Sequence, residues 1–95
     1  MKAYEVLEQH DWTQGWFARN MRGRCVSVND ETACSFCTVG AIDKAYPNQV
    51  INYRLRFKLK EYLYAKTGNF SILAWNDDPT RTKEEVISVL KELDI

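Results

Sequence analysis

The sequence lacks long hydrophobic runs, an excess of charge and an even number of cysteines. Thirteen basic residues balance thirteen acidic ones, so the net charge indicates no class of partner. The apolar runs are far too short to span a bilayer, and Glu5 and Glu8 stand where a secretory signal needs its apolar stretch. Three cysteines cannot all pair within the chain. We therefore expect a cytoplasmic protein whose cysteines are free thiols.

Low-complexity tracts and long polar runs are absent as well, which argues against a disordered chain. The hydrophobic fraction of 45% and the charged fraction of 27% are typical of globular proteins. Ninety-five residues leave no room for a second hydrophobic core. We therefore expect a single globular domain over residues 1–95.

Apolar periodicity and capping residues predict a mainly α fold of about four helices, with α+β as the alternative. The helices are expected over residues 2–10, from Asn29–Asp30 to Ala45 or Tyr46, over residues 48–66, and from Thr82 to about Leu93. A small hairpin is expected as well, with its turn at Met21–Gly23 and its better strand at Cys25–Val28. Gly40, inside the second helix, predicts a close contact with another helix.

Residues 50–60 are ambiguous, because apolar and basic residues alternate there as they do in a strand. Placed on a helix, the segment forms an aliphatic stripe that continues beyond the alternating run: Ile51, Leu55, Leu59, Tyr62 and Leu63. Tyr53, Phe57 and Tyr64 form a second, aromatic stripe on nearly the opposite side. Gly68 stands where a helix C-cap belongs, which favours the helix.

The segment from Trp75 to Val86 predicts a lid over the core, a turn and a helix start. Thr82 and Glu85 have the spacing of a capping box. Arg81 is expected to pair with a neighbouring aspartate, and Trp75 to cover the core. This structural motif comprises Trp75, Asn76, Asp77, Arg81, Thr82 and Glu85. The adjacent carboxylates of Asp77 and Asp78 could instead bind a hard cation, but turn and cap chemistry accounts for every residue type here.

Several short motifs occur in a recognisable order. They are Trp12-Thr13-Gln14-Gly15, Gly23, Cys37-Thr38-Val39-Gly40-Ala41-Ile42, Trp75-Asn76-Asp77 and Arg81-Thr82-Lys83-Glu84-Glu85-Val86. In this order the sequence resembles a domain-of-unknown-function family of small phage and bacterial proteins. Thr80 departs from that family, which usually has glycine after the proline, so the turn does not strictly require a glycine conformation. The resemblance implies one intact domain and no known activity.

The cysteines raise two alternatives. Cys34 and Cys37 have a zinc-ligand spacing, and Cys25 and His10 could complete a site, but the pair falls inside a predicted helix rather than on a knuckle turn. Cys37 could also be a nucleophile with His10 as its base. The following Gly-Ala favours close packing and an inert thiol. We therefore expect no metal, no cofactor, no catalytic residue and no small-molecule substrate.

A nucleic-acid-binding module is a further alternative, because basic residues gather in two stretches. The first is Arg19, Arg22 and Arg24, and the second is Arg54, Arg56, Lys58 and Lys60. Tyr53 and Phe57 would be available for base stacking. On a helix, however, Arg54 and Lys58 fall on one seam and Arg56 and Lys60 on the other, whereas phosphate binding normally needs one concentrated positive face.

We favour the hypothesis that this is an interaction protein. If the aliphatic stripe fills the core, the stripe of Tyr53, Phe57 and Tyr64 is left for a partner or for a second copy of the chain. We expect a noncatalytic accessory or regulatory protein that binds another protein or itself. The resemblance implies a phage origin, and a phage-encoded protein would act in the host cytoplasm. The short apolar runs lead us to expect no contact with a membrane.

Overall fold

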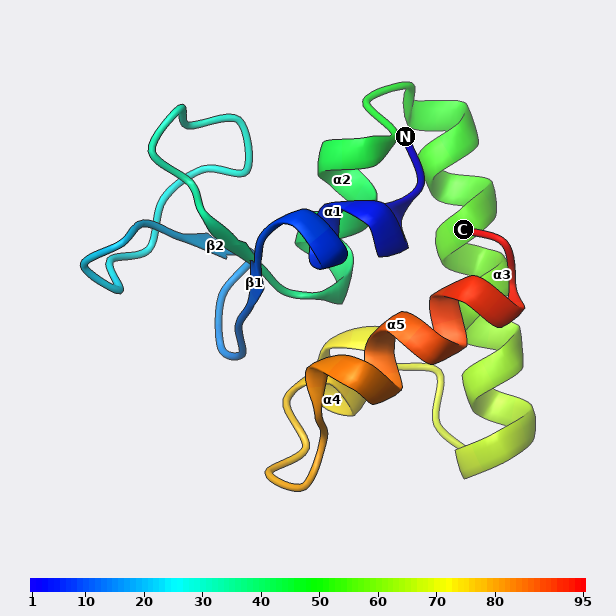
Figure 1. Cartoon of the computed structure of the whole chain (residues 1–95). Helices are drawn as coiled ribbons and strands as arrows, with labels where there is room; N and C mark the ends of the chain where they lie inside the picture. The colour runs from blue at the N-terminus through cyan, green and yellow to red at the C-terminus, as the bar shows by residue number, and fades with distance from the viewer.

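The computed structural model describes residues 1–95 and shows a mainly α protein with one small sheet (Figure 1). The helices are α1 (Ala3–Gln9), α2 (Thr38–Ala45), α3 (Gln49–Thr67), α4 (Ile72–Asn76) and α5 (Lys83–Glu92). The strands are β1 (Asp11–Trp12), β2 (Ala18–Arg19) and β3 (Ser35–Phe36). The predicted fold class is thus confirmed. No helix combines the length and the apolar character that crossing a membrane requires.

The central strand of the sheet is β3, although it is the last of the three in the sequence. It pairs in parallel with β1 and antiparallel with β2. The predicted hairpin is therefore only partly correct. Its turn exists, with Gly23 at a φ of 77°, but Cys25 forms only an isolated bridge to Arg19. Cys25 and Val26 lie along the edge of β2 that β3 leaves free, where the Val26 N–H donates to the Ala18 carbonyl at 3.1 Å, but no ladder forms, so the strand expected at Cys25–Val28 is wrong.

Helix α2 begins later than predicted. The expected helix start at Asn29–Asp30 is wrong, because the Asp30 carboxylate accepts a hydrogen bond from the Thr32 backbone N–H at 2.8 Å and closes a local turn. Such side-chain-to-backbone turns use the same residue types as helix caps. The cap of α2 is instead the Cys37 sulfur, which accepts from the Gly40 N–H at 3.3 Å. The helix ends at Ala45, ahead of Pro47 as predicted.

Helix α3 resolves the ambiguous segment in favour of a helix. The Asn48 side chain accepts hydrogen bonds from two backbone N–H groups of the first turn, and Gly68 ends the helix at a φ of 77°. Leu59 and Leu63 of the aliphatic stripe are fully buried, whereas Ile51 at its start is exposed. The helix therefore lies on the core along its middle and its C-terminal part.

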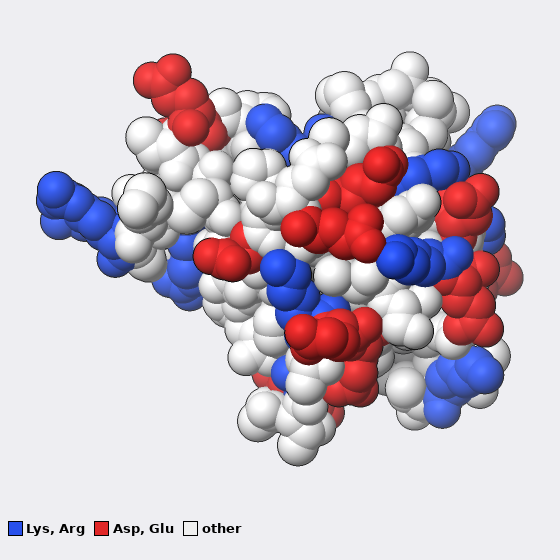
Figure 2. All heavy atoms as spheres, in the orientation of Figure 1, with Lys and Arg blue, Asp and Glu red and all other residues white.

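Helices α1 and α5 pack side by side and close one face of the core (Figure 1). Charged side chains of both signs alternate over this face (Figure 2), and Lys91 of α5 pairs with Glu8 of α1 at 2.9 Å. Beneath lies one core of fifteen buried apolar residues. They are Ala3, Val6, Leu7, Ala18, Phe36, Cys37, Val39, Ala41, Ile42, Leu59, Leu63, Ile72, Val86, Leu90 and Ile95.

Candidate binding groove

A buried asparagine is where three of the sequence motifs meet. Asn76, the last residue of α4, is fully buried. Its Oδ1 accepts hydrogen bonds from Trp12 Nε1 at 2.8 Å and from the backbone N–H and hydroxyl of Thr38 at 2.9 and 2.6 Å. Its Nδ2 donates to the Thr13 carbonyl at 3.1 Å and to Asp77 Oδ1 at 2.9 Å. We call this set of bonds the asparagine node.

The loop after β1 is fastened to the same segment by further bonds. Gln14 Nε2 donates to the backbone carbonyls of Asn76 and Asp78, both at 2.9 Å. The Gly15 N–H donates to Asp77 Oδ1 at 3.0 Å. Sequence reasoning treated Asn76 as part of a turn and missed this convergence. The sequence carried one signal for it: the motifs that converge here are rich in amide and hydroxyl side chains.

Arg81 is held by Trp75 rather than by an aspartate. Its guanidinium lies over the Trp75 ring, 4.5 Å from the centroid, and its Nε donates to the Trp75 carbonyl at 2.9 Å. Its ion pair is with Glu85 at 3.0 Å, so the predicted pairing with an aspartate is wrong. The predicted capping box is confirmed: the Glu85 N–H donates to Thr82 Oγ1, and the Thr82 N–H donates to Glu85 Oε1.

Asp77 and Asp78 use their carboxylates separately. Asp77 accepts from the asparagine node and from Gly15, while Asp78 Oδ1 accepts from the N–H and hydroxyl of Thr80 at 2.8 and 2.7 Å. The backbone N–H of Thr80, together with its hydroxyl, lowers the pKa of Asp78. Thr80 has a negative φ, since Asp94 is the one non-glycine residue with a positive φ. The turn thus does without a glycine conformation, as predicted.

The three cysteines lie in different environments. Cys25 is exposed, Cys34 is half-buried and Cys37 is buried. Burial raises the pKa of the Cys37 thiol, which outweighs the backbone hydrogen bonds that it accepts at the start of α2. His10 makes an edge-to-face contact with the Phe36 ring, with the centroids 5.5 Å apart. No group of three His, Cys, Asp or Glu side chains is placed to hold a metal ion.

The aromatic stripe of α3 is exposed. Tyr53, Phe57 and Tyr64 are 69%, 51% and 51% exposed. Tyr64 stacks on Phe70, which follows the end of α3, with the ring centroids 4.3 Å apart and the planes 9° apart. The stripe therefore continues from α3 into the segment that leads to α4.

Beside this stripe lie two hollows that meet at Phe17. One, of about 590 Å³, lies between Trp16, residues 25–29 and the facing ends of α2 and α3. The other, of about 560 Å³, lies between Phe17, α3 and the segment Asn69–Leu73. Both are lined by Phe17, Asp43 and Arg56. We call the two hollows together the aromatic groove.

Backbone contacts of the loop after β1 set the position of Phe17. The Cys37 N–H donates to the Phe17 carbonyl at 3.1 Å. A Cβ atom on Gly40 would lie 2.0 Å from that same carbonyl oxygen. The close approach predicted at Gly40 therefore exists, but its partner is loop backbone and not a second helix. Glycine is required there because any side chain would displace the loop.

The floor of the aromatic groove is polar. Asn52 Nδ2 donates to Asp43 Oδ1 at 2.8 Å and to the Tyr46 carbonyl at 3.1 Å. Arg56 NH1 lies 3.9 Å from Asp43 Oδ1, and its Nε is buried without a hydrogen-bond partner. Lys60, one turn further along α3, lines the second hollow.

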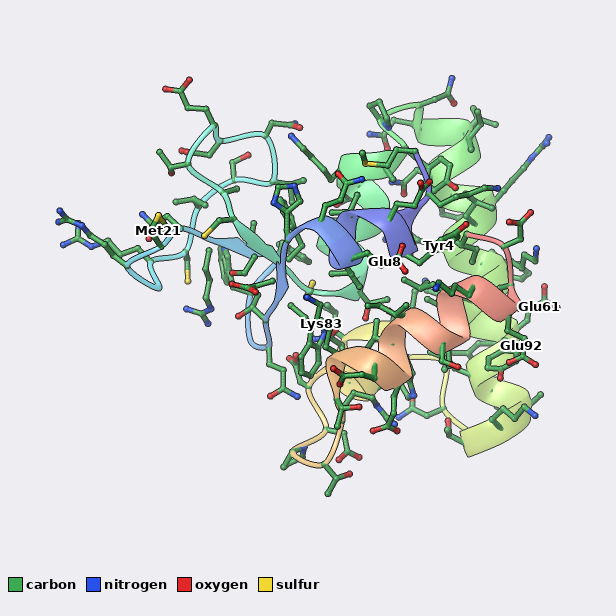
Figure 3. The ribbon with its side chains drawn as sticks, in the orientation of Figure 1. Tyr4, Glu8, Met21, Glu61, Lys83 and Glu92 are labelled. Atoms are coloured by element: carbon green, nitrogen blue, oxygen red, sulfur yellow. The ribbon has the colours of Figure 1, made fainter.

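The basic residues do not form one patch. Arg56 and Lys60 line the aromatic groove, whereas Lys58 Nζ donates to the Leu93 carbonyl at 2.6 Å and Arg54 lies beside Tyr53 and Phe57. Arg19 donates to Thr13 Oγ1 and to the carbonyls of Gln14 and Gly23. Arg22 and Arg24 flank the Gly23 turn in a loop that extends away from the helices, as Met21 shows in Figure 3.

The fold and the asparagine node define a small mainly α protein in which three short motifs are tied together by one amide. The chain belongs to the family of unknown function DUF6197, which matches residues 1–93. The predicted membership in a domain-of-unknown-function family is thus confirmed. No curated protein and no solved structure matches the chain.

Proposed function

We propose that this protein is a noncatalytic accessory or regulatory protein that binds a segment of another protein in the aromatic groove. The observation that carries the proposal is the gathering of exposed rings and aliphatic side chains at one place. Four of the eleven large hydrophobic residues that are exposed line the two hollows: Trp16, Phe17, Phe70 and Leu73. Tyr64 stacks on Phe70, and Tyr53 and Phe57 line a further hollow on the exposed side of α3. A phage origin rests on the motif resemblance alone.

Contiguous apolar surface of this kind marks interaction sites in soluble proteins, whereas single exposed hydrophobic residues do not. Tyrosine, tryptophan and phenylalanine are also the residues most enriched at the centres of protein interfaces. The groove is concave and its rim comes from the loop after β1, from α3 and from the start of α4. This shape suits an inserted segment better than the flat face of a second copy.

The side chains that a catalytic set would need are engaged in structure. The Cys37 sulfur caps α2 and its thiol has a raised pKa. The carboxylates of Asp77 and Asp78 accept hydrogen bonds from neighbouring backbone N–H groups. These arrangements support a binding role over a chemical one.

Paired glutamate substitutions inside and outside the groove test the proposal. Phe70 is exposed and lines the second hollow of the aromatic groove, whereas Val50 is an exposed apolar residue of α3 that lines neither hollow. We expect Phe70→Glu to abolish the capture of specific partners from a lysate of the source cells, and Val50→Glu to leave it unchanged. Quantitative mass spectrometry of the captured proteins is the readout, and melting temperature controls for folding.

Equal capture by wild type and Phe70→Glu would refute the proposal, as would equal loss in both variants. Sedimentation of the purified chain separates self-association from partner binding. A dimer that Phe70→Glu dissociates, and Val50→Glu does not, would show that the groove is filled by a second copy instead.

A further inference from the structure

Arg56 is a partly enclosed guanidinium that the chain itself leaves unsatisfied. Its Nε is buried without an acceptor, and its contact with Asp43, at 3.9 Å, is too long for a hydrogen bond. The other two enclosed arginines differ. Arg19 donates to three oxygen acceptors and Arg81 to two. The unused donors of Arg56 therefore mark a place where an acceptor from outside the chain would be stabilised.

Asp43 does not satisfy this guanidinium. The Asp43 oxygen nearest to Arg56 accepts a 2.8 Å hydrogen bond from Asn52, which holds the carboxylate away from the guanidinium. A buried donor without a partner costs about 1–3 kcal/mol. An anionic group that bound beside the guanidinium and accepted hydrogen bonds from it would remove that cost.

A second cation lies along the same wall of the groove. Lys60 takes part in none of the four ion pairs of the chain and lines the hollow that Arg56 shares with Phe70 and Leu73. Two cations and the single carboxylate of Asp43 leave this hollow with one net positive charge. One carboxylate from a ligand would balance it.

We propose that this hollow binds the carboxylate of an aspartate or glutamate of the partner segment, held by Arg56 and Lys60. A neighbouring apolar side chain of that segment lies against Phe17, Phe70 and Leu73. The inference rests on the proposed function and names the chemistry of the partner. A carboxylate fits better than a phosphate, because the walls are apolar and Asp43 would repel a doubly charged group.

Two small probes of one shape test this directly. 3-Phenylpropionate carries a ring and a carboxylate, and 3-phenylpropionamide is its neutral counterpart. Titrations followed by ¹⁵N NMR report backbone signals of the groove and the Nε–H signal of Arg56. We expect the carboxylate to bind about tenfold more tightly than the amide, because hydrogen bonds between charged groups are roughly twice as strong as neutral ones.

Arg56→Gln should bring the two affinities within about twofold of each other, as the lost charge-assisted bonds require. Arg54→Gln, on the other seam of α3, should preserve the difference. Lys60→Gln gives an independent result if Arg56→Gln fails to fold, and it should reduce the preference for the carboxylate at least in part.

Equal affinities for the two probes in the wild type would overturn the inference. So would the absence of chemical-shift changes on addition of either probe. Tighter binding of inorganic phosphate than of 3-phenylpropionate would overturn it as well and would assign the cations to a phosphate. These outcomes differ from failure of the proposed function, which is measured by the capture of partners with Phe70→Glu.

Discussion

Replacing Asn76 by alanine removes every side-chain bond of the asparagine node at once. Five hydrogen bonds are lost, and the groups left without their partner include Trp12 Nε1, the N–H and hydroxyl of Thr38, and the Thr13 carbonyl. Thr38 and Asn76 are both fully buried, so water cannot replace the amide without opening the structure. The substitution is therefore expected to be among the most destabilising in this chain.

The magnitude follows from the groups left unsatisfied. Each buried polar group left without a hydrogen-bond partner costs about 1–3 kcal/mol, and the N–H and the hydroxyl of Thr38 each carry that cost in full. Trp12 is half-buried and recovers part of its bond through water. We therefore expect Asn76→Ala to lower the free energy of unfolding by about 4 kcal/mol, a large share of the roughly 5–15 kcal/mol typical of a small domain.

Urea unfolding followed by tryptophan fluorescence measures this loss. Asn29→Ala is the matched control, because Asn29 is exposed and its side chain makes no hydrogen bond in the chain. The control should change the free energy of unfolding by less than about 0.5 kcal/mol. A loss below about 1 kcal/mol in Asn76→Ala would refute the reasoning, because it would mean that the node contributes no more than one ordinary hydrogen bond.

Four further predictions concern single groups. Gly40→Ala should cost about 3 kcal/mol in urea unfolding, because the new Cβ would meet loop backbone at 2.0 Å; an unchanged midpoint would contradict the geometry. Arg81→Ala should cost about 2 kcal/mol by the same assay, through its lost stacking and carbonyl bond, and a loss of partner capture at unchanged stability would contradict a structural role. Cys25 should react with a disulfide reagent within the mixing period, whereas Cys37 should react only as the protein unfolds, because it is buried and its pKa is raised; comparable rates would be inconsistent with this burial. The lowered pKa of Asp78 means that its stabilisation is complete above about pH 4 and is lost as the pH falls through the folded pKa, so the difference in unfolding free energy between wild type and Asp78→Asn should shrink in acid, and a constant difference would contradict it.

Local signals were enough to predict the longest helix and the last one. Asn48 and Gly68 mark the two ends of α3, and Thr82 with Glu85 mark the start of α5, because caps depend on residues within one turn. The start of α2 was missed for the same physical reason. Asp30 is as good a turn residue as it is a cap, and pairing of the sheet, which is not local, decided between them.

The candidate site was predictable only along a single helix. The exposure of Tyr53, Phe57 and Tyr64 follows from their periodicity on α3, since residues three, four and seven apart share a side. The aromatic groove beside this stripe was not predictable, because Phe17 and Leu73 reach it through contacts between segments far apart in the sequence. No periodicity within one segment encodes such contacts.

The asparagine node and the aromatic groove are linked by one loop, and this link separates two kinds of substitution. Hydrogen bonds to Asn76 and Asp77 and the close contact with the backbone at Gly40 hold residues 13–17 in place. The last of these residues, Phe17, lines the groove. Gly40→Ala should therefore weaken partner capture as well as stability, because it displaces the loop that carries Phe17. Arg81 contacts Trp75 and α5 rather than this loop, so Arg81→Ala should lower stability while the folded fraction binds normally. Unchanged capture per folded molecule in Gly40→Ala would show that the groove does not depend on the position of this loop.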